Sequence, residues 1–344
     1  MSDASRGQTE TACPQCGTEI ASALLACPSC QRLVHADELK RLAAEAERAG
    51  HAGEASAALG AWRQALDLLP RDSTQHQAVA ARIVALSRAV ENQPAAGKPS
   101  RWGKGAAGLG ALGALLAKFK FAIVFLLTKA KLLLFGLTKA GTLFSMLLSA
   151  GVYWTLWGWK FAIGIVLSIY VHEMGHVQAL QRYGIKATAP MFIPGLGAVI
   201  RLKQYPATPR EDARVGLAGP LWGLGAAAAA YGVYFATRIG VWGAIGHFGA
   251  WVNLFNLLPV WQLDGGRGFR ALTRVHRWLA AAVAASIYVV THEGLLLLIA
   301  LAAAASAGFS TAPDEADQPM LLEYLSLVVV LAALTRIAVP GAIQ

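Results

Sequence analysis

The stretch that decides the fold is FAIGIVLSIYVHEMGHVQALQ, residues 161–181. It places a His172-Glu-Met-Gly-His176 pentapeptide, which matches H-E-x-x-H, inside an apolar run. The run has about the 20 residues that a membrane-spanning helix needs. On a helix the two imidazoles project from one face and can both bind zinc, while Glu173 can take a proton from an attacking water. Ionisable groups are costly inside a membrane segment and usually mark function there, so the stretch predicts a membrane helix with a catalytic metal site.

A third metal ligand is expected because a catalytic zinc takes three protein ligands and keeps one position open. Between Lys104 and His292 the chain has four acidic residues, of which Glu211 and Asp212 are expected in a polar loop. The remaining candidate is Asp264, in Asn256-Leu-Leu-Pro-Val-Trp-Gln-Leu-Asp264-Gly-Gly. Pro259 and the two glycines should break the helix here, which membrane proteins tolerate where the backbone lines a cavity. The alternative for Asp264-Gly-Gly is an ordinary turn at the membrane surface.

The composition favours a chain that is largely embedded in a membrane. Apolar residues are 56% of the chain and charged residues 15%. Residues 1–104 are nearly neutral, with 12 Lys/Arg and 11 Asp/Glu, and residues 105–344 carry 18 Lys/Arg and 9 Asp/Glu. These basic residues flank apolar runs and form no basic face with interleaved aromatics, so a lipid bilayer is the expected partner and nucleic acid is not. Besides 161–181, apolar runs of spanning length occupy 140–159, 215–237, 239–263, 294–313 and roughly 319–335.

The amino-terminal region carries four cysteines in two Cys-x-x-Cys pairs. No apolar signal segment precedes them, so the region is expected in the cytoplasm, where thiols stay reduced. Each pair directs two thiolates at one point, and two pairs complete a tetrahedral structural zinc site. Two disulfides or unrelated thiols are the alternatives. Residues 1–35 are therefore predicted to form a zinc ribbon, with the ligands Cys13, Cys16, Cys27 and Cys30.

Helical periodicity follows the cysteines. Leu39, Leu42 and Ala46 form one apolar stripe, and Leu59, Trp62, Ala65 and Leu69 form another. Residues 36–93 are predicted to be a short soluble helical unit in the cytosol, similar to a tetratricopeptide hairpin or simply a helical spacer. Residues 94–113, rich in Pro, Gly, Ala and Lys, read as a linker. Residues 114–344 would be the membrane-embedded domain with its core at about 140–270. Its segment 114–139 is expected to be interfacial, and 278–307 is left open as one helix or two.

The two metal-site motifs together resemble the site-2 protease family of intramembrane zinc metalloproteases. That family pairs H-E-x-x-H on one transmembrane helix with an Asn-x-x-Pro…Leu-Asp-Gly stretch two helices later, as residues of about 140–270 do here. The resemblance implies that His172, His176 and Asp264 bind the catalytic zinc and that Glu173 is catalytic. It also implies that the substrates are transmembrane helices. Asn256 and Pro259 are the candidate substrate-binding residues. Residues 189–201, an apolar run interrupted by Pro and Gly, look like the family's strand-like re-entrant segment, and Ala218-Gly219-Pro220 looks like a packing element of the next helix.

The charge distribution predicts how such a bundle lies in the cell membrane. If 140–159 crosses outward, the inner loops 182–214 and 265–277 hold six and four Lys/Arg, and the outer turns hold only Lys160 and Arg238. This satisfies the positive-inside rule. The prediction is thus a mainly α, multi-pass membrane bundle with a re-entrant strand segment, preceded by the zinc ribbon and the helical unit.

Two other functions remain open on the sequence. One is a membrane H-E-x-x-H peptidase of another class, with a distant Glu as third ligand. The other is a non-catalytic membrane adaptor that docks a protein partner through the zinc ribbon. The favoured function is hydrolysis of peptide bonds in or near the transmembrane helices of membrane-protein substrates, with one catalytic and one structural Zn²⁺.

Overall fold

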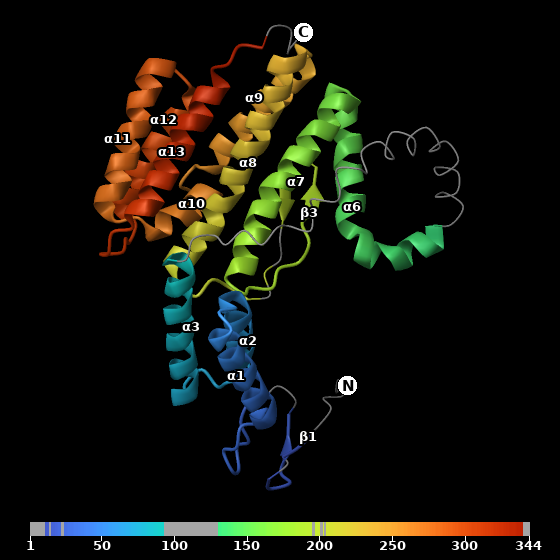
Figure 1. Ribbon diagram of the computed structural model, residues 1–344, viewed down its shortest axis with the longest axis vertical. Coiled ribbons are helices and arrows are strands. Elements are labelled where there is room, and N and C mark those ends of the chain that lie inside the picture. Colours follow the sequence, from blue (N-terminus) through green and yellow to red (C-terminus); the bar gives the residue numbers. More distant parts are fainter. Residues whose placement is uncertain are drawn as a thin grey trace, which may run out of the picture.

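The computed structural model of the chain describes residues 11–13, 15–21, 24–92, 130–194, 197–199, 202 and 204–339. This part is mainly helical, which confirms the predicted class. The helices from residue 130 onward form one body, and the three amino-terminal helices lie at one end of it (Figure 1). The predicted linker 94–113 lies outside the described residues, as does the predicted interfacial segment up to residue 129. Its remainder, 130–139, is helical. The predicted domain boundaries stay predictions.

The amino-terminal part contains two short strands and three helices. Strand β1 (Thr11–Ala12), directly before the first Cys-x-x-Cys pair, pairs antiparallel with β2 (Glu19–Ile20), which lies between the two pairs. Helices α1 (Ala36–His51), α2 (Ala55–Asp67) and α3 (Thr74–Asn92) follow. The predicted apolar stripes pack inward: Leu42, Ala46, Leu59, Trp62 and Ala65 are all buried.

The helical body begins with α6 (Ala130–Trp157) and α7 (Trp159–Arg182), which are separated at Gly158. Gly158 has φ +82°, a conformation that favours glycine, and α6 ends two residues before the predicted limit at 159. The further helices are α8 (Pro209–Thr237), α9 (Gly240–Asn256), α10 (Asp264–Gly268), α11 (Arg274–Thr291), α12 (Gly294–Phe309) and α13 (Gln318–Thr335), with a single 3-10 turn (Phe269–Ala271) after α10. Residues 278–307 therefore contribute to two helices.

The segment predicted to be strand-like forms a hairpin. Strand β3 (Met191–Ile193) pairs antiparallel with β4 (Gly197–Val199), and an isolated bridge between Ala187 and Leu202 extends the pairing toward the hairpin's base. The backbone N–H of Phe192 donates to the Ser145 hydroxyl of α6 at 3.0 Å. The hairpin is thus fixed to α6 on one side, and β4 lies nearer α7.

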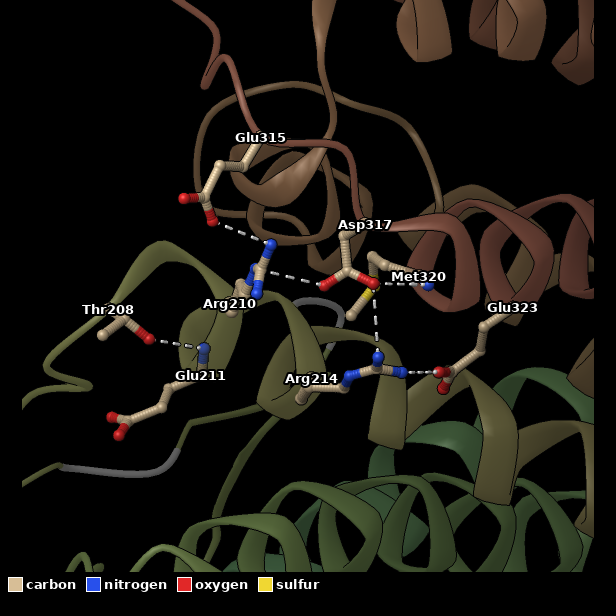
Figure 2. A network of polar contacts seen from close by, with 8 residues as sticks. All are labelled: Thr208, Arg210, Glu211, Arg214, Glu315, Asp317, Met320 and Glu323. Carbon is tan, nitrogen blue, oxygen red and sulfur yellow. Dashed lines mark hydrogen bonds and ion pairs between the residues drawn. The ribbon is translucent and has the colours of Figure 1, made fainter. Parts of the chain in front are cut away.

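Ion pairs join the start of α8 to the loop before α13 and to α13 itself (Figure 2). Arg210 pairs with Glu315 at 3.2 Å, and Arg214 pairs with Glu323 at 2.9 Å. Asp317 lies between the two arginines and also caps α13 by accepting from the Met320 backbone N–H at 3.0 Å. The large buried cluster beneath this network includes Leu217, Leu254, Ile299 and Tyr324, so α8, α9, α12 and α13 share one core.

Within the described residues, one helix passes a length and hydropathy test for crossing a membrane. This helix is α13, and α12 is similarly apolar but shorter. Of the other predicted spans, α7 contains the ionisable residues His172, Glu173 and His176, which lower its hydropathy, and α9 is short, with 17 residues. The predicted multi-pass arrangement therefore stays a proposal.

Candidate metal centre

The side chains of His172, His176 and Asp264 lie together in the interior. His172 and His176 are on successive turns of α7, and Asp264 is the first residue of α10. His172 Nε2 lies 3.1 Å and His176 Nε2 3.3 Å from the two oxygens of the Asp264 carboxylate. The two Nε2 atoms are 3.2 Å apart. All three residues are more than nine-tenths buried.

This geometry fits a tetrahedral zinc ion. Zinc binds nitrogen and oxygen at about 2.0–2.1 Å, which places neighbouring ligand atoms of a tetrahedron about 3.3 Å apart. The three observed separations lie between 3.1 and 3.3 Å. Two imidazoles and one carboxylate are also a ligand set of catalytic zinc sites, which leave the fourth position open. The donor set and its spacing therefore suit the metal that the sequence predicts.

The outer nitrogen of each imidazole has its own buried partner. His172 Nδ1 lies 2.8 Å from the Asn253 side-chain oxygen, and His176 Nδ1 lies 2.8 Å from the Val215 carbonyl. With Nε2 facing a metal, each Nδ1–H donates to its oxygen, which fixes the tautomer and the orientation of the ring. The Asn253 amide donates in turn to the Gly249 carbonyl at 2.8 Å.

Sequence reasoning missed Asn253. A signal was available, because an amide in an apolar helix needs a polar partner and is a functional candidate. The family-like motif points instead to Asn256, three residues later.

Helix α8 approaches the imidazoles closely enough to require glycine. A Cβ on Gly219 would lie 2.2 Å from His176 Nε2 and 2.8 Å from His172 Nε2. A Cβ on Gly175 would lie 2.3 Å from the Ala218 carbonyl oxygen. The Ala218-Gly219-Pro220 segment, predicted to be a packing element, therefore forms one wall of the site.

Glu173 and the three candidate ligands line a cavity of about 790 Å³. Glu173 is 8% exposed. Asn256 also lines the cavity, whereas Pro259 is buried and is not among the lining residues. The roles of Asn256 and Pro259 in substrate binding remain predictions. The hairpin contributes Gly197 and Ala198 to the wall, and α9 contributes Phe248, Trp251 and Phe255, whose rings stack in sequence.

Three charged residues, Asp212, Arg267 and Arg270, line another part of the same cavity. Asp212 pairs with Arg267, whose Nη2 is 2.9 Å from the carboxylate, and with Arg270. The expectation of a polar loop at Glu211 and Asp212 was wrong, because both residues are in the first turn of α8. Thr208 caps this turn by accepting from the Glu211 backbone N–H, and Pro209 suits a first helical position, so the acidic pair stabilises a helix N-terminus.

The four cysteines form the second cluster. Cys13 and Cys30 have sulfurs 3.6 Å apart, as do Cys16 and Cys27, and all four sulfurs lie within 4.8 Å of one another. A tetrahedral zinc with bonds of about 2.3 Å to sulfur separates its ligands by about 3.8 Å, so these thiols also fit zinc. A hydrogen bond from the Thr18 hydroxyl, together with the Thr18 backbone, lowers the pKa of Cys16 to about 6, which favours the metal-binding thiolate.

Comparison with known proteins agrees with the geometry. Residues 160–239, which include the whole H-E-x-x-H motif, match the sequence model of peptidase family M50. This segment is similar to peptidase family M50. The resemblance to the site-2 protease family that the motifs suggested is confirmed. Asp264 and the four cysteines lie outside the matched M50 segment.

Two curated relatives of the M50 segment are named as zinc metalloproteases. Zinc metalloprotease MJ0392 of Methanocaldococcus jannaschii is 29% identical over 114 residues, which cover 31% of this chain and 32% of the relative. Rip3 of Mycobacterium tuberculosis, named provisionally as a zinc metalloprotease, is 34% identical over 138 residues, which cover 38% of this chain and 33% of the relative. The chain thus spans about a third of the length of these relatives. No solved structure matches it significantly.

Proposed function

We propose that this chain is an intramembrane zinc metalloprotease that hydrolyses peptide bonds in or near the transmembrane helices of its substrates. The observation that carries the proposal is the placement of the His172 and His176 Nε2 atoms and the Asp264 carboxylate within 3.1–3.3 Å of one another. This constellation lies in a cavity that Glu173 also lines. The names of the M50 relatives support the same chemistry.

The residues of the cavity have separate roles in the proposed reaction. His172, His176 and Asp264 would hold the zinc, which when bound supplies the Lewis acidity that polarises a peptide carbonyl and makes water nucleophilic near neutral pH. Glu173 takes a proton from the attacking water and returns it to the departing amine. One water is consumed, the C–N bond breaks, and a carboxylate and an amine are released. Asn253 and the Val215 carbonyl keep the two imidazoles aligned throughout.

The proposed location is the cell membrane, with several helices crossing the bilayer. Large apolar side chains point outward on several helices, including Leu143, Leu147 and Leu156 of α6, each about 60% exposed. Outward apolar surface of this extent needs a lipid or protein partner. Helices α1–α3 lie at the end of the body where α7 ends and α8 begins (Figure 1). A cytoplasmic amino-terminal region therefore places the basic loop 183–208 on the inner side, in agreement with the charge rule.

A substrate helix must unwind before its carbonyls can react, because its backbone hydrogen bonds hide them. The hairpin offers a place for the extended chain. Its β4 strand lines the cavity through Gly197 and Ala198, and an unwound substrate segment can pair there as an added strand. Asn256 lines the same cavity and offers its side-chain amide to this strand.

Substrate trapping tests the proposed function. Full-length wild-type protein and Glu173→Gln are compared in membranes that contain a single-span reporter protein. We expect the wild type to release a fragment cut within the span, and Glu173→Gln to bind the reporter uncut while retaining zinc. Glu293→Gln is the matched control, because Glu293 precedes α12 and belongs to neither metal-ligand cluster. Equal cleavage by wild type and Glu173→Gln would exclude the proposed catalytic role.

A further inference from the structure

The helical unit α1–α3 is packed against the protease body. Leu59, Trp62 and Ile83 share one buried cluster with Leu180, Tyr183 and Val215, which lie at the end of α7 and the start of α8. The contact is close at the backbone as well. A Cβ on Gly184, which has φ +66°, would lie 2.5 Å from the Gly60 nitrogen. The Ser56 hydroxyl also donates to the Arg182 carbonyl at 2.8 Å.

Arg63 is the central polar residue of this contact. It lies on α2 and is 4% exposed. Its Nε donates to the Tyr183 carbonyl at 3.1 Å, and its Nη1 donates to the Tyr205 carbonyl at 3.4 Å. Its Nη2 pairs with the fully buried Glu211 carboxylate at 2.8 Å. One guanidinium therefore contacts both ends of the loop that carries the hairpin and the helix that follows it.

Glu211 links the Arg63 contacts to the end of the loop. The oxygen that faces Arg63 also accepts from the Ala207 backbone N–H at 2.7 Å, so the carboxylate holds the end of the loop against α2. In Figure 2 the Glu211 side chain points away from the ion pairs of Arg210 and Arg214, which indicates that it belongs to a separate network. A buried carboxylate that loses its partner is costly, so the pair should act as a unit.

Two exposed contacts from α2 reinforce the same loop. Lys186 donates to Gln64 at 3.1 Å, and Gln204 donates to Asp67 at 2.6 Å. These loop residues flank the Ala187–Leu202 bridge at the hairpin's base. Helix α2 therefore holds both strands of the base, and Gly197 and Ala198 of β4 line the cavity that Glu173 also lines.

We propose that Arg63 is a positioning residue for substrate binding: through Tyr183, Tyr205 and Glu211 it fixes the hairpin at the cavity, so that the amino-terminal helical unit is part of the working protease. The inference rests on the proposed function. It assigns to the helical unit a role different from partner docking. Loss of Arg63 should loosen the hairpin without removing the metal ligands, because none of the three contacts the guanidinium.

Hydrogen exchange and cleavage of the full-length protein test this role together. Arg63→Gln is compared with Arg82→Gln, which removes the same charge from α3, where Arg82 lies over Trp62 and pairs with Glu47 at the surface. For Arg63→Gln we expect amides of residues 183–208 to exchange more than about tenfold faster. We also expect kcat/KM on the single-span reporter to fall about tenfold or more, with zinc content unchanged. Arg63→Lys should lie between wild type and Arg63→Gln, because an ammonium cannot reproduce the planar fork. Arg82→Gln should stay within about twofold of wild type.

Several outcomes would overturn the inference. For Arg63→Gln, these outcomes are an unchanged rate of amide exchange in residues 183–208, faster amide exchange with unchanged cleavage, and a loss of zinc that accompanies the loss of cleavage. If Arg63→Gln does not fold, Glu211→Gln and Arg63→Lys are judged by the same criteria. Amide exchange is measured without substrate, so it reports on the role of Arg63 even if the wild type cleaves no reporter. A wild type that cleaves no reporter would count against the proposed function and not against the role of Arg63.

Discussion

The side-chain oxygen of Asn253 lies 2.8 Å from His172 Nδ1, so a residue on α9 orients a metal-ligand candidate on α7. Helix α9 also leads into the loop that delivers Asp264 to the same site. These two connections fix the position of α9 relative to α7 at the metal site. Partners of this kind commonly tune metal affinity although they never contact the metal.

Replacing Asn253 tests this arrangement. Asn253→Ala removes the acceptor and leaves the His172 ring free to rotate, so zinc affinity should fall by about 10- to 100-fold. Competition with a chelator measures this without any substrate. Asn256→Ala, one turn further along α9, is the control and should keep the wild-type affinity. Equal affinities for all three proteins would contradict the orienting role.

Gly219 gives a steric prediction. An alanine methyl would lie 2.2 Å from His176 Nε2, so Gly219→Ala should displace the imidazole and abolish both catalytic zinc binding and cleavage. Gly225→Ala on the same helix is the matched control, because no heavy atom lies within 4 Å of its Cβ position. That change should be neutral or stabilise the helix by up to about 1 kcal/mol. Zinc content of the purified variants decides between the two results.

The cysteine cluster predicts a second, separable zinc. Cys13→Ser should remove this zinc and leave the catalytic one, and cleavage should continue. Because all four thiols must lose their protons to bind the metal, zinc affinity of this cluster should fall as the pH is lowered toward 5. Zinc release measured against pH in Cys13→Ser and wild type isolates the contribution of the cluster. Loss of cleavage in Cys13→Ser beside an unaffected Glu173→Gln would favour the adaptor function.

Labelling of introduced cysteines tests the membrane orientation. In a chain whose four native cysteines are replaced by serine, Tyr205→Cys should react with an impermeant thiol reagent only from the cytoplasmic side, and Ile239→Cys only from the opposite side. Both positions are exposed, at 80% and 52%. Labelling of both residues from one side would exclude the proposed crossing of α8.

Local patterns predicted the chemistry of the site well. The spacing of His172 and His176 fixes their shared face on any helix, and the ligand requirement of zinc pointed to Asp264 because acids are so scarce. The choice between Asn253 and Asn256 depends on how α9 is rotated against α7, which no local pattern contains. Glu211 and Asp212 differ from the prediction because Thr208 caps a helix that contains both residues, whereas their charge alone indicates a loop.

The docking of α1–α3 could not be predicted from the sequence. The Pro- and Gly-containing stretch after residue 93 predicts a linker, and the apolar stripe of α2 does not specify which surface buries it. Arg63 and Glu211 are 148 residues apart. Their pairing appears only when the tertiary structure places α2 against the end of α7.

X-ray absorption at the zinc edge tests the central claim most directly. The full-length chain with its four cysteines replaced by serine is loaded with zinc, so that the remaining metal reports on one site. We predict about one zinc per chain, with nitrogen and oxygen ligands at about 2.0–2.1 Å that include two imidazoles, and loss of this zinc in Asp264→Ala. Retention of zinc with an unchanged spectrum in Asp264→Ala, or failure of the parent chain to bind zinc, would contradict it.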